Sequence, residues 1–131
     1  MKVLLINGSP RREGNTFIAL SEAARALEAE GVGEEIVSIG TKAVQGCIAC
    51  GKCAELGRCV FNDALYNEVR EKLVGADALV VGSLVYYAGP NGSLCACWTG
   101  CSTPVPTAWP TSLPRRWPYA AGAGRARRST G

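Results

Sequence analysis

The sequence contains no long hydrophobic run. Its first apolar run, residues 3–6, stops at Asn7, which is too short for the apolar core of a signal peptide or for a membrane span. We therefore expect a cytoplasmic protein with no place in a membrane. At 131 residues, the chain is expected to form one domain around one core.

Acidic residues are absent from the last part of the chain. All 11 lie at or before Asp77, whereas five arginines follow Gly92, so the formal net charge of +3 comes from the tail. A protein that binds nucleic acid is expected to carry a basic face on its folded part. Residues 1–92 offer no such excess of basic residues, which argues against a nucleic-acid partner.

The same tail has an anomalous composition. Residues 93–131 lack Ile, Asp, Glu, Lys and Phe, but hold all 3 tryptophans and five of the 7 prolines. No apolar period of two or 3.6 persists there, so we expect no strand or helix beyond residue 92. We expect residues 1–92 to be the N-terminal part of a folded domain and residues 93–131 to be a Pro/Trp/Arg-rich tail.

Apolar patterning in the first part of the chain alternates between strands and helices. Buried strands are expected at residues 2–7, 35–39 and 78–82. Helices are expected at residues 15–30 and 63–74, where apolar residues recur at helical spacing. This order predicts an α/β protein with a parallel sheet and right-handed crossovers.

A polar loop joins the first strand to the first helix. It reads Gly-Ser-Pro-Arg-Arg-Glu-Gly-Asn-Thr from Gly8 and precedes a helix N-terminus, where α/β proteins bind anions. Ser9, Asn15 and Thr16 offer donors, and Arg11 can pair with a phosphate. The glycine spacing fits neither a Walker A loop nor G-x-G-x-x-G. The loop predicts a phosphate site, with a polar turn and an Asn or Thr helix cap as the alternative.

Four of the 7 cysteines lie close together between the second strand and the second helix. Cys47, Cys50, Cys53 and Cys59 have the spacing C-x₂-C-x₂-C-x₅-C over a loop of residues 46–59. Four thiolates suit a [4Fe–4S] cluster or a tetrahedral zinc ion, and a redox disulfide is a further alternative. Clustered cysteines without a signal peptide indicate metal or redox chemistry. The three cysteines of the tail are given no ligand role.

The first loop resembles that of a known family. Residues 7–11, followed by Gly14-Asn15-Thr16, resemble the phosphate loop of the NAD(P)H-dependent FMN reductases, which are flavodoxin-like. The resemblance implies a doubly wound parallel sheet of five strands, of which three are recognisable in this sequence. It also implies that the FMN phosphate is held by Ser9, Arg11, Asn15 and Thr16.

A second loop supports the same resemblance. Residues 82–87 read Gly-Ser-Leu-Val-Tyr-Tyr and resemble the family's loop along the isoalloxazine ring, usually G-S-P-V-Y, with Leu84 in place of the proline. This loop follows a parallel strand at its carboxyl end, on the same edge of the sheet as the first loop. The resemblance implies FMN contacts from Ser83, Val85, Tyr86 and Tyr87. For Tyr87, the alternative is that it only covers a sheet edge.

The cysteine spacing resembles the iron–sulfur flavoproteins, a branch of this family, and implies a [4Fe–4S] cluster on all four cysteines. The implied function is FMN-dependent NAD(P)H oxidation with electron transfer to a carrier, in a homodimer or tetramer. The cofactors carry this chemistry, which is consistent with the absence of histidine. The alternatives are an NAD(P)H:FMN or quinone reductase without a cluster, and a zinc-stabilised non-enzymatic module or truncated inactive product.

One hypothesis for the tail is a shift of the reading frame. From Cys97 onward, the third base of each codon can be read with the first two bases of the next codon. The genetic code then gives Leu-Asp and permits Arg-Leu-Phe, which resembles the start of a helix that family members carry at this place. Sequencing the source DNA tests this hypothesis.

Overall fold

Strands and helices alternate along the chain, as the sequence predicts. The structure is a computed structural model that describes residues 1–102, so most of the predicted tail lies outside the described residues. The elements are β1 (Lys2–Asn7), α1 (Asn15–Ala29), β2 (Gly33–Ser38), α2 (Cys53–Leu56), α3 (Ala64–Val74), β3 (Ala78–Gly82), β4 (Val85–Tyr86), β5 (Gly89–Pro90) and α4 (Gly92–Ser102).

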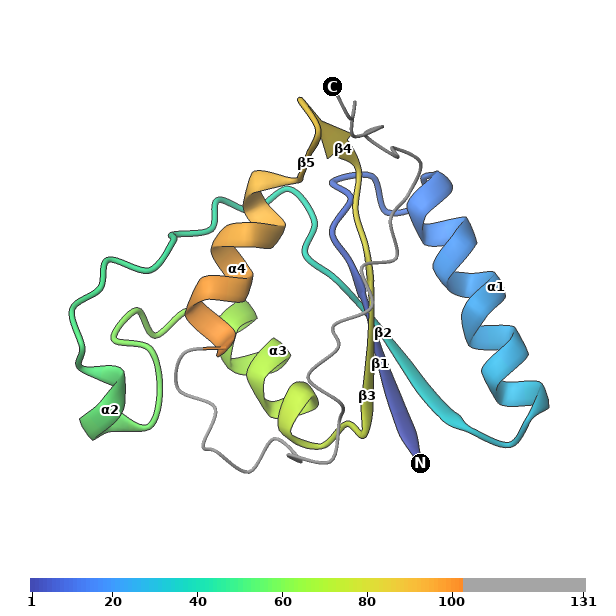
Figure 1. Ribbon diagram of the computed structural model, residues 1–131, viewed down its shortest axis with the longest axis horizontal. Helices are drawn as coiled ribbons and strands as arrows, with labels where there is room; N and C mark the ends of the chain where they lie inside the picture. Colours follow the sequence, from blue (N-terminus) through green and yellow to red (C-terminus); the bar gives the residue numbers. More distant parts are fainter. Residues whose placement is uncertain (103–131) are drawn as a thin grey trace, which may run out of the picture.

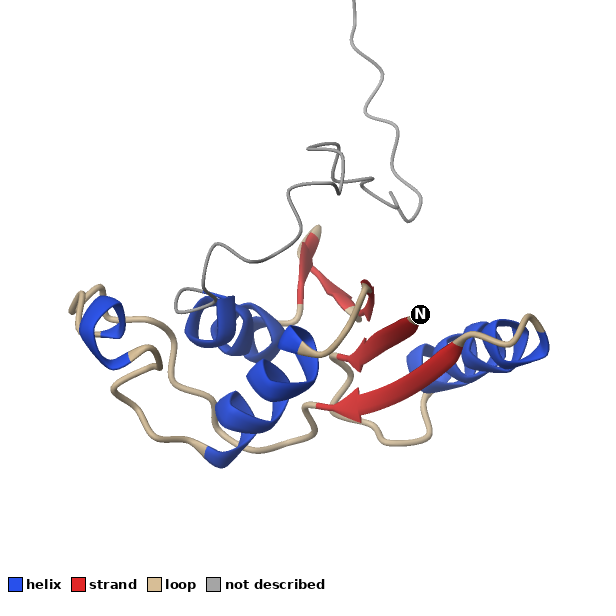
Figure 2. Cartoon of the chain, turned by 90° about the horizontal axis from the view of Figure 1, so that it is seen from below, coloured by secondary structure: helices blue, strands red, loops and turns tan. Residues whose placement is uncertain are grey.

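Three of the strands form a parallel sheet. Their order is β2-β1-β3, with β1 in the centre. Helix α1 covers one face, and α3 and α4 lie against the other (Figures 1 and 2). The predicted α/β sheet with helices on both faces is therefore confirmed for the three strands that the sequence shows. None of the described helices is both long and apolar enough to cross a membrane.

The two faces of β1 belong to two separate parts of the core. Val3 and Leu5 pack on the α1 side with Leu20 and Ala24. Leu4 and Ile6 face the other way and pack with residues of α3 and α4. Because β1 is buried on both faces, its apolar residues form a continuous run in the sequence, as in other central parallel strands. This central strand fixes the position of the loop that follows it.

Helix α4 contradicts the prediction that no helix follows residue 92. Leu94, Cys97 and Cys101 are buried in the core, at the helical spacing i, i+3 and i+7. Gly100 lies so close to the ring of Tyr66 that an added Cβ would come within 2.7 Å of it. The buried stripe was missed because cysteine and glycine supply most of it, although cysteine packs as a small hydrophobic residue.

Candidate functional site

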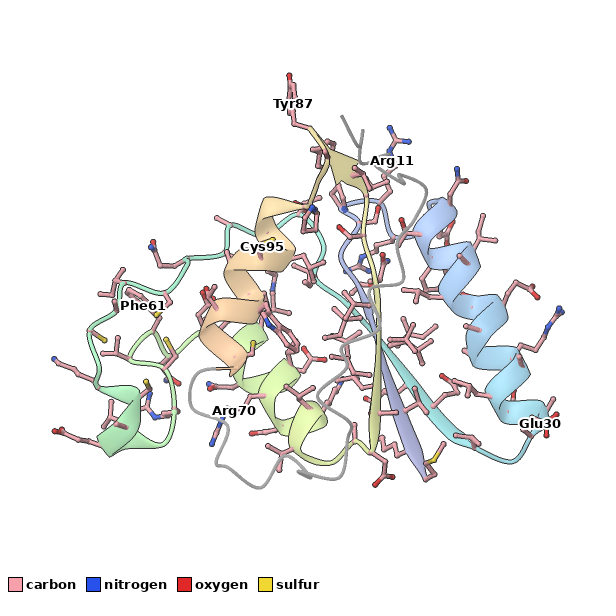
Figure 3. All side chains as sticks on the ribbon, in the orientation of Figure 1. Arg11, Glu30, Phe61, Arg70, Tyr87 and Cys95 are labelled. Carbon is pink, nitrogen blue, oxygen red and sulfur yellow. The ribbon has the colours of Figure 1, made fainter. Side chains whose placement is uncertain are left out.

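The two predicted FMN loops meet at the carboxyl end of the sheet. The loop after β1 and the segment after β3 lie at the same end of the molecule, where Arg11 and Tyr87 are labelled (Figure 3). The Gly8 amide donates a hydrogen bond of 2.8 Å to the Gly82 carbonyl. This bond continues the β1–β3 ladder into the loops, so the end of each strand fixes the start of its loop.

A hollow of about 450 Å³ opens between these loops. Its lining is Ser9, Arg11, Glu13, Gly14, Asn15 and Leu84. Three of the four residues predicted to hold a phosphate therefore share one hollow with a residue of the second loop. The acidic Glu13 in the same lining was not assigned from the sequence.

The N-terminus of α1 is left open toward an anion. Its N-cap residue is Gly14, which makes no side-chain capping bond. The alternative of an Asn or Thr helix cap is therefore wrong, and the first-turn N–H groups keep no side-chain partner at the cap. Upstream, the Ser9 hydroxyl oxygen accepts the Arg11 amide at 3.1 Å, which orders the loop before any ligand binds.

Thr16 has a different position from the other predicted phosphate residues. It is not part of the lining of the hollow. A Cβ atom added to Gly82 would come within 2.7 Å of the Thr16 methyl group. The structure thus places Thr16 in the contact between α1 and the end of β3, and Gly82 permits that close approach.

The predicted ring loop is a short hairpin. Val85 pairs with Pro90, and Tyr86 pairs with Gly89. The two turn residues, Tyr87 and Ala88, have positive φ angles of 47° and 62°. Asn and Gly are the usual residues in such a turn, and neither is present, which is why the sequence did not predict a hairpin. Val85, Tyr86 and Tyr87 are all exposed, so they are available to a ligand or to another chain.

Ser83 is held inside the second loop. Its hydroxyl donates to the Leu84 carbonyl at 2.9 Å and accepts the Asn91 amide at 2.9 Å. The predicted FMN contact therefore already has two partners within the chain. Asn91 was missed in the sequence, although Asn is among the preferred residues before the first turn of a helix.

The cysteine loop forms an extension beyond α3, opposite α1 (Figures 1 and 3). A small hollow of about 20 Å³ is lined by Cys47, Ile48, Cys50, Gly51, Cys53, Cys59, Val60 and Phe61. All four predicted metal ligands thus line one space, together with apolar side chains. The Cys47 amide donates to the Thr99 hydroxyl at 3.1 Å, so α4 anchors the start of this loop.

The backbone of the cysteine loop turns sharply around its sulfur atoms. Ala49, Gly51 and Gly57 have φ angles of 55°, 72° and 64°. The Ala49 amide lies 3.4 Å from the Cys47 sulfur and donates to it. Backbone N–H donors to cysteine sulfur are among the groups that set the potential of an iron–sulfur centre.

The four cysteine thiols are of a type that can hold a metal centre, but their sulfur atoms are not arranged around one point in this structure. The seven cysteines are all free thiols in the described part of the chain. Among residues 1–102, no group of three or more His, Cys, Asp or Glu side chains is placed to hold a metal ion.

A buried thiol pair and a buried phenol lie under the cysteine loop. The Cys97 and Cys101 sulfurs are 3.5 Å apart. The hydrogen bond between them lowers the pKa of Cys97 and raises that of Cys101. Burial, followed by the charge of Cys59, raises the pKa of Tyr66 to about 12. These groups belong to the core against which Cys59 and Phe61 of the loop pack.

Comparison with known proteins decides the family. The model of the NADPH-dependent FMN reductase family matches residues 1–112. The chain belongs to the NADPH-dependent FMN reductase family. Members of this family are flavodoxin-like, so the predicted flavodoxin-like fold is confirmed as an incomplete one. The match extends past residue 92, where the motifs recognised in the sequence end.

Several relatives are named iron–sulfur flavoproteins. One from Methanocaldococcus jannaschii is 40% identical over 94 residues, which are 72% of this chain and 48% of that protein. One from Archaeoglobus fulgidus is 38% identical over 87 residues, 66% of this chain and 39% of the relative. One from Methanosarcina thermophila is 34% identical over 86 residues, which are 66% of this chain and 44% of that protein. The chain spans less than half the length of each of these relatives.

Proposed function

We propose that this FMN reductase family member is an FMN-dependent NAD(P)H oxidoreductase that transfers electrons, of the iron–sulfur flavoprotein type. The observation that carries the proposal is the hollow between the two loops. It joins Ser9, Arg11 and Asn15 to Leu84 at the carboxyl end of a parallel sheet, which is where α/β proteins bind nucleotides. The family match and the names of the relatives support the same function.

The chain's own residues would bind and orient FMN at this hollow. The guanidinium of Arg11 and the open first turn of α1 would receive the phosphate, because both present N–H donors and positive charge. The exposed residues of the β4–β5 hairpin, among them Val85, Tyr86 and Tyr87, would lie along the flavin ring. Bound FMN supplies hydride acceptance from a nicotinamide cofactor and single-electron transfer.

The cysteine loop would hold the second cofactor. Cys47, Cys50, Cys53 and Cys59 are a suitable ligand set for a [4Fe–4S] cluster, which supplies single-electron transfer. Ile48, Val60 and Phe61 line the same hollow and would limit the access of water to the sulfurs. A nicotinamide donor and an electron acceptor are the proposed partners, in a cytoplasmic setting that keeps these thiols reduced.

A reductase without a cluster is the second candidate. It is favoured by the finding that no three metal-ligand side chains of the described residues are gathered around one point. In that case the chain would reduce FMN or a quinone, and the four cysteines would remain free thiols. Iron content separates the two candidates, and a colourless zinc protein without flavin would indicate a non-enzymatic module.

A homodimer or tetramer is part of the proposal. Of the described strands, only β1 pairs with β3, and Val80 and Val81 on β3 are exposed. An apolar strand with a free edge is a surface that a further strand, of this chain or of another copy, can cover. Light scattering of the purified chain measures the assembly.

Two neighbouring arginines provide the test of FMN binding. Arg11 lines the hollow and Arg12 does not, although both are exposed. We expect Arg11→Ala to raise the dissociation constant for FMN by about 10- to 100-fold, the usual effect of losing a hydrogen bond to a charged group. The affinity for riboflavin, which has no phosphate, should stay unchanged. Arg12→Ala is the matched control, and an equal loss in both variants would contradict the assignment.

A further inference from the structure

Asn91 joins three segments that are far apart in the sequence. It precedes the first turn of α4, and its side-chain oxygen accepts the Ser93 amide at 3.0 Å. Its side-chain amide donates to the Gly8 carbonyl at 2.7 Å. Its backbone amide donates to the Ser83 hydroxyl at 2.9 Å. One partly buried residue thus connects the loop after β1, the loop after β3 and the start of α4.

Gly8, which Asn91 contacts, is enclosed by neighbouring elements on several sides. The Gly8 amide already bonds to the Gly82 carbonyl at 2.8 Å, so Asn91 holds the opposite side of the same residue. A Cβ on Gly8 would come within 2.8 Å of a methyl group of Leu94 in α4. Gly8 is therefore enclosed by β3, Asn91 and α4, and the residues that follow it begin the phosphate loop.

We propose that Asn91 is a positioning residue that sets the separation between the phosphate loop and the ring loop. This inference rests on the proposed function, because it concerns a ligand that carries both a phosphate and an aromatic ring. When such a ligand binds both loops at once, its affinity depends on how well their spacing is fixed in advance. A ligand that binds only one loop does not depend on that spacing.

The amide group is suited to this task because it is a donor and an acceptor at once. Its oxygen caps α4, and its NH₂ group reaches Gly8. Asn91→Asp keeps the shape and the capping oxygen but places a carboxylate oxygen against the Gly8 carbonyl. Asn91→Ser keeps a capping oxygen and removes the NH₂ group. In both variants α4 stays capped and the bridge to Gly8 is lost.

The test compares three probes on the full chain. FMN would contact both loops, riboflavin the ring loop, and inorganic phosphate the phosphate loop. For both variants we expect the dissociation constant for FMN to rise about tenfold and those for riboflavin and phosphate to change less than about threefold. Equal losses for all three probes would assign Asn91 a purely structural role. An unchanged affinity for FMN would overturn the proposal.

A flavin-free measurement separates this inference from the proposed function. Hydrogen exchange should become faster at the amides of Gly8 and Ser9 in Asn91→Ser, while the amides of α3 keep their protection. The control is Asp63→Ala, which removes the side-chain cap from Leu65 and Tyr66 in α3 and should affect α3 alone. If the wild-type chain binds no flavin, the proposed function fails. Unchanged exchange at Gly8 in Asn91→Ser would show instead that the Asn91 side chain does not hold Gly8 in place.

Discussion

Ala88 has a backbone conformation that is unfavourable for a residue with a Cβ atom. With Tyr87 it forms the turn of the β4–β5 hairpin at positive φ, a conformation that costs a residue with a Cβ about 1–2 kcal/mol. Glycine adopts it freely but loses more entropy on folding. We expect Ala88→Gly to raise the free energy of unfolding by about 0.5–1 kcal/mol, measured by urea denaturation.

The matched control for this substitution is Ala26→Gly. Ala26 is exposed in the last turn of α1, where glycine in place of alanine lowers stability by up to about 1 kcal/mol. The two substitutions make the same chemical change with opposite expected signs. A loss of stability in Ala88→Gly similar to that in Ala26→Gly would show that the turn stores no strain.

Three elements are held together at the amino end of the sheet by one carboxylate. Glu35 of β2 contacts the Lys2 ammonium of β1 at 2.8 Å and the Lys72 ammonium of α3 at 2.9 Å. Hydrogen bonds from Lys2, and then from Lys72, lower the pKa of Glu35 below its ordinary value of 4.5. A carboxyl with a lowered pKa stabilises the fold while it is ionised.

We therefore expect Glu35→Gln to lower the free energy of unfolding at pH 7 by about 1 kcal/mol or less, because the pairs are partly exposed. The difference from wild type should be complete above the ordinary pKa of 4.5 and should disappear as the pH falls through the lower pKa of the folded protein. Denaturation curves at several pH values measure it. Glu28→Gln on the exposed face of α1 is the control, and a difference that persists at low pH would contradict the account.

Elements with a strong local signal were predictable from the sequence. Strand β1 was found because its apolar run ends at Asn7, and α1 was found because its apolar residues recur at helical spacing. Helix α4 was missed because its buried face consists largely of cysteine and glycine, whose fit depends on Tyr66 in another helix. The hairpin was missed because its turn lacks glycine. Both failures occur where tertiary contacts, and not local preferences, determine the conformation.

The candidate site was predictable to a similar extent. The sequence placed both loops on one edge of the sheet because parallel strands have their carboxyl ends together, and the hollow joins Arg11 to Leu84 as that argument requires. Bonds between distant residues have no local signature. The bridge from Asn91 to Gly8 spans 83 positions, and the contact of Thr16 with Gly82 likewise depends on the packing of α1.

At the scale of the whole chain, the shift of the reading frame after Cys97 stays a prediction. Helix α4 forms from the residues as printed, and its last turns include Cys97 and Gly100. The frame hypothesis predicts that the source DNA contains an inserted or deleted base near the codon for Cys97. Sequencing that DNA on both strands would reveal such a base. An uninterrupted frame that encodes Trp98-Thr99-Gly100 would contradict the hypothesis.

The central claim is that one chain holds FMN at the paired loops and an iron–sulfur cluster at the cysteine loop. The most direct measurement is an anaerobic ultraviolet–visible spectrum of the reconstituted full chain, with flavin and iron assayed on the same sample. Two cysteine variants serve as controls. Cys50→Ser should lose iron and keep flavin, whereas Cys95→Ser, exposed on α4, should keep both.

The account predicts flavin peaks over a broad brown absorbance that reductant bleaches, with about four iron atoms per chain. Flavin without iron would remove the cluster and leave the plain reductase. A spectrum with neither chromophore would contradict the central claim, because the two loops and the four cysteines would then hold no cofactor in this chain.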